Sequence, residues 1–251
     1  MIPLRDDNPK LGPALATILI IGVNVAVWIF VQGLGTDPRL VESVCTLGAI
    51  PGELLGHVRA GTAVLLSPGH ACVTEAKPNW FTPLTSMFLH GSWFHIIGNM
   101  WFLWVFGDNV EDAMGPLRFI VFYVLCGLAA VTAQVLITPT SAVPMVGASG
   151  AIGGVMGAYA LLYPRVPVHL LVFLGFYVDR IAVPAFLMLG YWFVLQLLGG
   201  IPSLGGGGGG VAFFAHVGGF LTGIALVPLF RQRDRVAAHR AMLMRQAERT
   251  Y

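Results

Sequence analysis

Six stretches of this chain are apolar over lengths that suit membrane-spanning helices, and this pattern constrains the fold more than any other feature. A transmembrane helix needs about 20 mostly apolar residues. The stretches lie at 13–33, 93–108, 117–137, 149–163, 181–199 and 212–230. Only 10% of the 251 residues are charged, whereas a soluble domain carries about 25%. We therefore predict an all-α integral membrane protein with six transmembrane helices in one compact domain, residues 13–230.

The remaining segments are connections and ends. Residues 1–12 form the N-terminus, 34–81 a long polar loop and 231–251 a basic tail. The first apolar run is too long for the core of a signal peptide, so we interpret it as a retained helix. The stretch 166–177 is apolar but too short to span, and we expect it at the interface or folded back as a loop. The glycine run 205–210 is interpreted as a tolerant loop, with a mobile substrate entrance as the alternative.

The basic residues orient the helices. Of the 14 Lys and Arg residues, Arg39, Arg59 and Lys77 fall on the outer side when both termini lie inside, and the other eleven fall on the inner side. This asymmetry fits the positive-inside rule and an even number of spans. We therefore expect cytoplasmic termini and an outward-facing loop 34–81. The net charge of +2 gives no reason to expect a nucleic-acid partner.

A serine in a glycine frame begins the fourth apolar stretch. Gly147 and Gly150 flank Ser149 closely in the sequence Gly-Ala-Ser-Gly. Unpaired N–H groups at a helix start can stabilise an oxyanion, and small neighbours leave space around the hydroxyl. This arrangement indicates a nucleophile. The alternative is an N-cap serine in a glycine-rich packing helix.

A single histidine, His216, begins the sixth apolar stretch at the depth predicted for Ser149. Small residues four apart allow two helix backbones to approach closely. The fourth and sixth stretches carry such pairs at Gly150/Gly154, Gly153/Gly157 and Gly219/Gly223. If these helices pack together, His216 can accept the Ser149 proton as a general base. Otherwise His216 is a structural hydrogen-bond partner.

A third polar group begins the second apolar stretch. His95 and Asn99 are four residues apart and share one helix face, and His90 lies just before the helix. His95 and Asn99 can donate hydrogen bonds to an oxyanion, although structural bonds between helices are the alternative. Asn99 is a poor zinc ligand, and no Cys or acidic residue lies close in sequence. We expect neither a metal nor another cofactor.

These motifs together resemble the signature of rhomboid intramembrane serine proteases. The resemblance extends from Trp80 to Gly223, with the motifs in the family's order. It rests on His95-x-x-x-Asn99, Gly147-Ala148-Ser149-Gly150, Ala215-His216-x-Gly218-Gly219-x-x-x-Gly223, Phe88-Leu89-His90, the stretch 107–112 and Gly115. It implies the six-helix bacterial form in an inner membrane, with single-span transmembrane proteins as substrates. The loop 34–81 then corresponds to the family's membrane-embedded first loop.

The resemblance also implies the roles of individual residues. Ser149 is the nucleophile and His216 the general base, while Asn99, His95 and the Ser149 N–H form the oxyanion hole. His90, Gly147 and Gly150 support this site. Some rhomboids carry an aromatic residue where this chain has Gly153. We therefore expect His216 to be oriented instead by a neighbour, Phe213 or Phe214.

Two other classes of protein remain as alternatives. One is a catalytically inactive rhomboid-like binding or quality-control protein, which the complete set of polar residues argues against. The other is a small transporter, for which we would expect paired intramembrane charges or broken helices in related halves. The natural substrate and the oligomeric state are not readable from the sequence.

The remaining polar features are expected to be structural. Cys45 and Cys72 share the loop 34–81, and the sequence does not decide whether they form a disulfide. Cys126 is predicted to be a buried thiol. Three acidic residues near the end of the second helix are expected to cap helices and make interface contacts: Asp108, Glu111 and Asp112. The tail is predicted to form a helix on anionic lipid, with a site for a soluble partner as the alternative.

Overall fold

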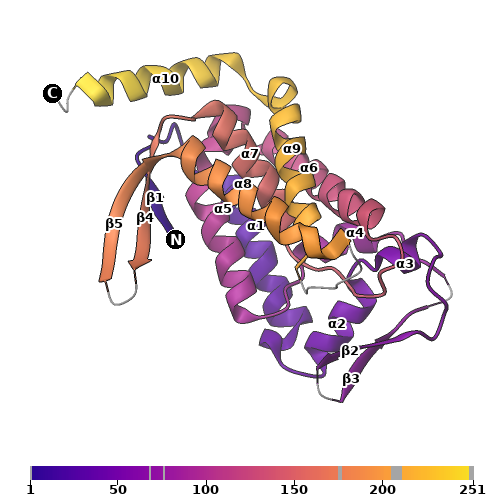
Figure 1. The fold of residues 1–251 in the computed structure, drawn as a ribbon. Coiled ribbons are helices and arrows are strands. Elements are labelled where there is room, and N and C mark those ends of the chain that lie inside the picture. The colour runs from indigo at the N-terminus through magenta and orange to yellow at the C-terminus, as the bar shows by residue number, and fades with distance from the viewer. Residues whose placement is uncertain (1, 68, 76, 175–176, 205–210, 249–251) are drawn as a thin grey trace.

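The computed structural model describes residues 2–67, 69–75, 77–174, 177–204 and 211–248 (Figure 1). The glycine run 205–210 lies outside the described residues. The helices are α1 (Leu15–Ala26), α2 (Arg39–Leu47), α3 (Pro51–Leu54), α4 (Thr82–Thr85), α5 (Trp93–Met114), α6 (Pro116–Ile137), α7 (Ser149–Leu162), α8 (Ala185–Leu204), α9 (Phe213–Phe230) and α10 (Arg233–Glu248). A π-helical segment, η1 (Val27–Val31), extends α1, and η2 (Gly33–Gly35) and η3 (Ser86–Phe88) are 3-10 turns. The strands are β1 (Ile2–Asp6), β2 (Ala63–Ser67), β3 (His70–Val73), β4 (Pro167–Leu174) and β5 (Tyr177–Pro184).

Helices occupy most of each predicted apolar stretch. Within the described residues, three helical segments are long and apolar enough to cross a membrane: Pro116–Ile137, Ala185–Pro202 and Phe213–Phe230. Two apolar helices are shorter, Leu15–Val31 and Ser149–Leu162. The second stretch continues beyond its predicted end at residue 108 to Met114, where Gly115 with φ 78° ends α5 and Pro116 starts α6. The presence of six membrane spans stays a prediction.

The chain is mostly helical, as predicted, but it also forms two small sheets that the all-α prediction did not include. The stretch 166–177, expected as an interfacial segment or loop, is largely β4, which pairs antiparallel with β5 and with the N-terminal β1. The fifth helix consequently begins at Ala185 and not at residue 181. Val168, Leu170 and Val172 are buried and alternate with more exposed residues, as in a strand with one covered face. The second sheet is the β2–β3 hairpin in the loop 34–81.

Helix α7 lies inside the bundle and packs closely on α9. A Cβ atom built on Gly219 would lie 1.9 Å from the carbonyl oxygen of Gly150, and one on Gly223 would lie 2.0 Å from that of Gly154. Only glycine fits where two backbones approach so closely. The predicted pairing of these small-residue faces is therefore confirmed.

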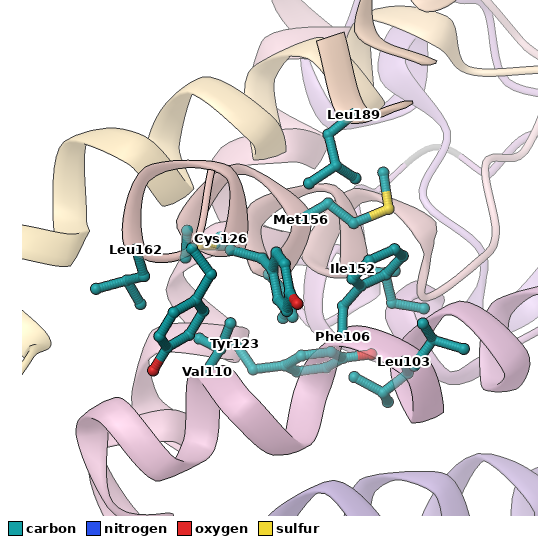
Figure 2. Packing of buried hydrophobic residues seen from close by; sticks show 14 of the residues in the cluster. Leu103, Phe106, Val110, Tyr123, Cys126, Ile152, Met156, Leu162 and Leu189 are labelled. Carbon is teal, nitrogen blue, oxygen red and sulfur yellow. The ribbon is translucent and has the colours of Figure 1, made fainter. Parts of the chain in front are cut away.

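Buried side chains from the neighbouring helices pack around α7. Figure 2 shows this cluster. Elsewhere in it, the rings of Phe106 and Tyr159 make an edge-to-face contact with their centroids 5.0 Å apart. The labelled members are Leu103, Phe106 and Val110 from α5, Tyr123 and Cys126 from α6, Ile152, Met156 and Leu162 from α7, and Leu189 from α8. Cys126 is a buried free thiol, as predicted. The cluster fixes α7 against its neighbours and so fixes the height of Ser149.

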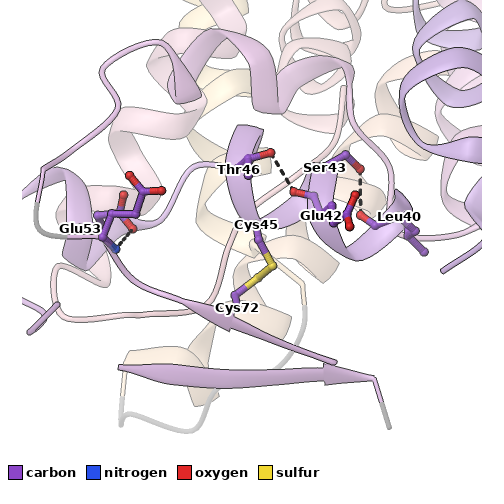
Figure 3. Close-up of a disulfide and its surroundings, with 8 residues drawn as sticks. Leu40, Glu42, Ser43, Cys45, Thr46, Glu53 and Cys72 are labelled. Atoms are coloured by element: carbon purple, nitrogen blue, oxygen red, sulfur yellow. Dashed lines mark hydrogen bonds between the residues drawn. A yellow bond between two sulfur atoms is a disulfide. The ribbon is translucent and has the colours of Figure 1, made fainter. Parts of the chain in front are cut away.

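A disulfide joins the two cysteines of the loop 34–81. Cys45 on α2 is bonded to Cys72 on β3, with Cα atoms 5.2 Å apart (Figure 3). The bond ties the β2–β3 hairpin to α2, at the end of the bundle far from α10 (Figure 1). An isolated antiparallel β-bridge between the backbones of Ala49 and Met145 joins this loop to the segment that leads into α7.

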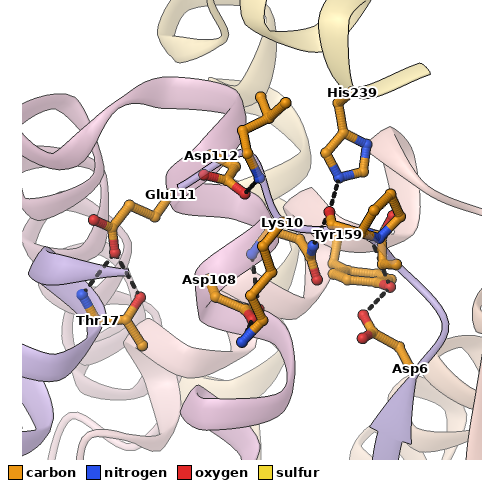
Figure 4. A network of polar contacts seen from close by, with 12 residues as sticks. Asp6, Lys10, Thr17, Asp108, Glu111, Asp112, Tyr159 and His239 are labelled. Atoms are coloured by element: carbon orange, nitrogen blue, oxygen red, sulfur yellow. Dashed lines mark hydrogen bonds and ion pairs between the residues drawn. The ribbon is translucent and has the colours of Figure 1, made fainter. Parts of the chain in front are cut away.

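Carboxylates at the other end of the bundle hold the N-terminal segment in place (Figure 4). Glu111 accepts hydrogen bonds from the Ala16 and Thr17 N–H groups at 2.9 and 2.8 Å, and so caps α1. Asp108 pairs with Lys10, and Asp112 accepts from the Leu11 N–H at 2.7 Å. The predicted capping role is confirmed for Glu111, whereas Asp108 and Asp112 contact the N-terminal segment and the predicted interface contacts stay a prediction.

Two further contacts complete this polar network. The Tyr159 hydroxyl donates to the carboxylate of Asp6, and the His239 ring on α10 lies 2.6 Å from the Pro9 carbonyl oxygen. Burial raises the pKa of the Asp6 carboxyl to about 6. The N-terminal segment therefore links α5, α7 and α10.

Candidate functional site

Ser149 is the first residue of α7, and Gly147, two residues before it, has a positive φ angle. Gly147 has φ +133°, a conformation that L side chains rarely adopt, and its N–H donates to the Ser86 carbonyl at 2.9 Å. A Cβ atom at Gly147 would also lie 2.8 Å from Nε2 of His95. The glycine therefore gives the chain its turn into α7 and leaves room for the His95 ring beside Ser149. The predicted position of Ser149 at a helix start is confirmed.

His216 lies in the first turn of α9, and its ring contacts the serine. The distance between Nε2 of His216 and Oγ of Ser149 is 2.7 Å, a hydrogen bond across the α7–α9 interface. The neighbouring Ala215 N–H donates to Oε1 of Gln134 on α6 at 3.2 Å, which fixes the start of α9. A hydroxyl bonded to an imidazole is the arrangement in which a base activates an oxygen nucleophile.

Gln196 on α8 contacts the other ring nitrogen of His216. Its Oε1 lies 2.7 Å from Nδ1 of His216. Because an amide oxygen can only accept, Nδ1 carries the proton and Nε2 presents a lone pair to Ser149. Gln196 was not among the residues predicted from the sequence. The available signal was a lone amide in the apolar run from Ala185 to Leu204, where polar groups are costly and usually functional.

Trp192, one turn before Gln196 on α8, lies beside the His216 ring. The two ring centroids are 5.9 Å apart, whereas that of Phe213 lies 6.5 Å away and edge-on. A Cβ atom at Gly153 would lie 3.0 Å from the His216 carbonyl oxygen and 3.7 Å from the Trp192 ring. The expected neighbour Phe213 therefore contributes an edge contact, but α8 supplies the amide and the larger aromatic ring. Gly153 is small because the backbone of α9 passes against it.

His95 lies near the start of α5 with a defined pattern of hydrogen bonds. Ser92 caps the helix by accepting from the His95 N–H at 3.2 Å, and Nδ1 of His95 accepts from the Gly91 N–H at 3.3 Å. An accepting Nδ1 leaves the proton of the neutral ring on Nε2. That nitrogen is the one that lies beside Gly147. It is a hydrogen-bond donor facing the segment that leads to Ser149.

Asn99 is placed one turn further along α5 and retains an unused donor. It is 8% exposed, and its Nδ2 atom is buried without a hydrogen-bond partner in the described structure. A buried amide without a partner costs free energy, so the donor is available to a ligand or to water. Asn99 and His95 thus have the unused donors that an oxyanion site requires.

His90 is fully buried behind His95. Their ring centroids are 5.1 Å apart in an edge-on contact. Gln32, after η1, holds the His90 backbone with two hydrogen bonds, accepting from its N–H at 2.8 Å and donating to its carbonyl at 2.7 Å. His90 therefore contacts His95, and no hydrogen bond joins it to Ser149 in the described structure.

A small cavity lies beside Ser149. Its volume is about 30 Å³, and its lining includes Gly147, Ser149, Gly150 and Ala215. This is room for roughly one or two water molecules. Within the described ranges, no group of three or more His, Cys, Asp or Glu side chains is placed to hold a metal ion. The chemistry available here is that of the hydroxyl, the two imidazoles, the amides and water.

Comparison with known proteins matches this chain to rhomboid proteins, both by a family model and by individual relatives. A sequence model described as the Rhomboid domain matches residues 77–233. The chain is 30% identical over 157 residues to Rhomboid-like protein 11, chloroplastic, of Arabidopsis thaliana, which covers 60% of this chain and 52% of that protein. It is 34% identical over 140 residues to Rhomboid protease GluP of Bacillus subtilis, covering 56% of this chain and 26% of that protein. The chain thus spans about half or less of the length of these relatives.

Proposed function

This chain belongs to the rhomboid family, and from that premise we propose that it is a serine endopeptidase that acts within the membrane. The family match and the apolar helices make it an integral membrane protein. We propose transmembrane proteins with a single span as substrates, cut near the outer face of a bacterial inner membrane, with both termini of the enzyme in the cytoplasm. The relative GluP of Bacillus subtilis is named a rhomboid protease.

The observation that carries the proposal is the hydrogen-bonded series Ser149–His216–Gln196. Its two distances are both 2.7 Å, and its three members come from α7, α9 and α8. A binding protein or a transporter has no need for a serine hydroxyl aligned on an imidazole whose second nitrogen is also held. The series therefore favours the enzyme over an inactive rhomboid-like protein.

The proposed reaction begins when Oγ of Ser149 attacks a substrate carbonyl carbon and its proton passes to Nε2 of His216. The positive imidazole keeps its Nδ1–H on the Gln196 oxygen. Negative charge develops on the carbonyl oxygen, where the Ser149 N–H, Nε2 of His95 and Nδ2 of Asn99 are the proposed donors. Each such donor contributes about 3–4 kcal/mol to transition-state stabilisation.

The second half of the reaction reverses these roles. His216 returns its proton to the leaving amine nitrogen, and the peptide bond breaks to give an acyl-enzyme on Ser149. A water molecule then attacks the ester carbonyl while His216 takes its proton, and the Ser149 oxygen leaves and is reprotonated. The cavity beside Ser149 has room for that water.

Labelling with a fluorescent fluorophosphonate tests this function without a known substrate. We expect the probe to label the wild-type chain and to fail on Ser149→Ala, with slower labelling of His216→Ala. Ser141→Ala, which alters a serine outside the proposed site, should label as the wild type does. Equal labelling of Ser149→Ala and wild type would exclude Ser149 as the reactive nucleophile.

A further inference from the structure

A basic groove lies far from the proposed protease site, where α9 is followed by α10. Its volume is about 440 Å³. The lining residues are Arg231, Arg233, Val236, Ala237, Arg240, Ala241 and Met244. From Arg233 onward these residues recur every three or four positions, so they form one face of α10. Figure 1 shows α10 lying across the end of the bundle, at an angle to α9.

The wall formed by α10 is held in place by contacts on its other face. The Gln232 N–H, just before the helix, donates to the Ala113 carbonyl of α5 at 2.8 Å. His239 is fully buried, contacts the Pro9 carbonyl oxygen and lies against the ring of Tyr163 with centroids 4.6 Å apart. The groove is therefore a fixed feature of the fold, and its shape does not require a ligand.

The groove concentrates positive charge. In the part of the chain that the structure describes, none of Arg231, Arg233 and Arg240 lies within ion-pair distance of a carboxylate. Asp234, the acidic residue in the first turn of α10, is not among the lining residues. Guanidinium groups bind phosphate with two parallel hydrogen bonds, and the start of a helix also favours an anion. These features favour a phosphate-bearing ligand.

The position of the groove, directly after the apolar helix α9, indicates which kind of molecule supplies the phosphate. α9 is apolar from Phe213 to Phe230, and Arg231 is the first charged residue after it. Arginines directly after a membrane helix lie at the level of lipid headgroups. Met244 on the groove wall is 66% exposed, and Leu229, two residues before Arg231 on α9, is 74% exposed. The groove therefore carries apolar surface beside its charges, and the end of α9 before it is also apolar. A lipid offers both a phosphate and acyl chains, whereas an acidic peptide offers only the charge.

We propose that the groove between the end of α9 and α10 binds the headgroup of an anionic phospholipid. The phosphate lies among Arg231, Arg233 and Arg240, and the acyl chains run along α9. This site is independent of the proposed protease activity. It assigns to the C-terminal helix a specific lipid contact in addition to general attraction to a charged surface.

Native mass spectrometry of the full chain in detergent, after removal of co-purified lipid, tests the proposal. The probes are short-chain phosphatidylglycerol, short-chain phosphatidylcholine and inorganic phosphate. The groove variant is Arg231→Gln with Arg240→Gln. The matched control, Arg118→Gln with Arg245→Gln, removes the same charge from exposed residues outside the groove.

We expect wild type to bind phosphatidylglycerol about tenfold more tightly than phosphatidylcholine, a difference of about 1.4 kcal/mol. The groove variant should lose about tenfold in affinity for phosphatidylglycerol, while the control stays within about twofold of wild type. Ala241→Trp, which fills the groove and keeps every charge, should also lose binding. This second variant keeps the test decisive if the double arginine variant fails to fold.

Three results would overturn the proposal. Equal losses in the groove variant and the control would mean that only overall charge matters. Competition by inorganic phosphate at the same concentration as the lipid would indicate a site for a free anion. Displacement of the lipid by a glutamate-rich peptide at equal concentration would indicate a site for a protein partner.

Discussion

Replacing Gln196 with leucine removes the oxygen that accepts the hydrogen bond from Nδ1 of His216, at nearly constant side-chain volume. In the resting enzyme this is a bond between neutral groups, with a net contribution of about 0.5–1.5 kcal/mol. In the transition state His216 is positive, and hydrogen bonds to charged groups contribute about 1.5–3 kcal/mol. The transition state therefore loses about 1–1.5 kcal/mol more than the resting enzyme, which lowers kcat about 5- to 13-fold.

A second effect adds to this loss. Without the Gln196 oxygen, the proton of neutral His216 is no longer held on Nδ1, and the tautomer with the proton on Nε2 cannot accept from Ser149. We therefore expect kcat of Gln196→Leu to fall at least about tenfold, with KM little changed because Gln196 contacts His216 and not the substrate. Gln196→Glu keeps an acceptor and should recover most of the rate.

The assay is cleavage of a fluorescent transmembrane substrate by purified variants in lipid vesicles, with thermal unfolding measured in parallel. Tyr191→Phe, which removes a polar group from the half-exposed face of the same helix, is the matched control and should leave kcat unchanged. A folded Gln196→Leu variant with wild-type kcat would refute the reasoning. So would a Gln196→Glu variant as slow as the leucine variant.

Three further predictions concern the rest of the molecule. Asn99→Ala and His95→Ala should each lower kcat about 10²–10³-fold in the same vesicle assay, with little effect on KM. A larger change in KM than in kcat would contradict their role as oxyanion donors. Gly223→Ala places a Cβ atom 2.0 Å from the α7 backbone and should lower the unfolding temperature. The control Gly190→Ala has no heavy atom within 4 Å of its added Cβ and should not lower it. Equal unfolding temperatures for the two variants would be inconsistent with the close packing. Because burial raises the folded-state pKa of Asp6 to about 6, its contribution to stability is complete below about pH 4 and is lost as the pH rises through 6. Asp6→Asn should remove this part of the pH dependence in thermal unfolding, and an unaltered pH profile would count against it.

The sequence predicted the central geometry of the site because the relevant signals are local. The small-residue spacing on the fourth and sixth stretches predicted the α7–α9 contact, and the positions of Ser149 and His216 at two helix starts predicted their similar depth. The 2.7 Å contact between their side chains is consistent with both features, although the side-chain conformations that make it come only from the structure. The assignment of their roles in a reaction stays a prediction until activity is measured.

Gln196 and the sheet were missed for different reasons. A lone amide in an apolar helix indicates that its side chain has a polar partner. Which residue that partner is depends on how α8 packs against α9, and no local sequence pattern predicts this packing. The strand β4 was missed because a short apolar run does not distinguish strand from loop or buried helix. Its partner β1 lies more than 150 residues away, paired as Ile2 with Leu171. The N-terminal segment was therefore interpreted as a simple end of the chain.

The most direct test of the central claim is cleavage of a fluorescent single-span substrate in proteoliposomes by wild type, Ser149→Ala and His216→Ala side by side. We expect cleavage by wild type and a loss of at least about 10³-fold in each variant, because neither half of the pair activates the reaction alone. Equal cleavage by all three proteins would contradict it and would mean that the activity resides elsewhere.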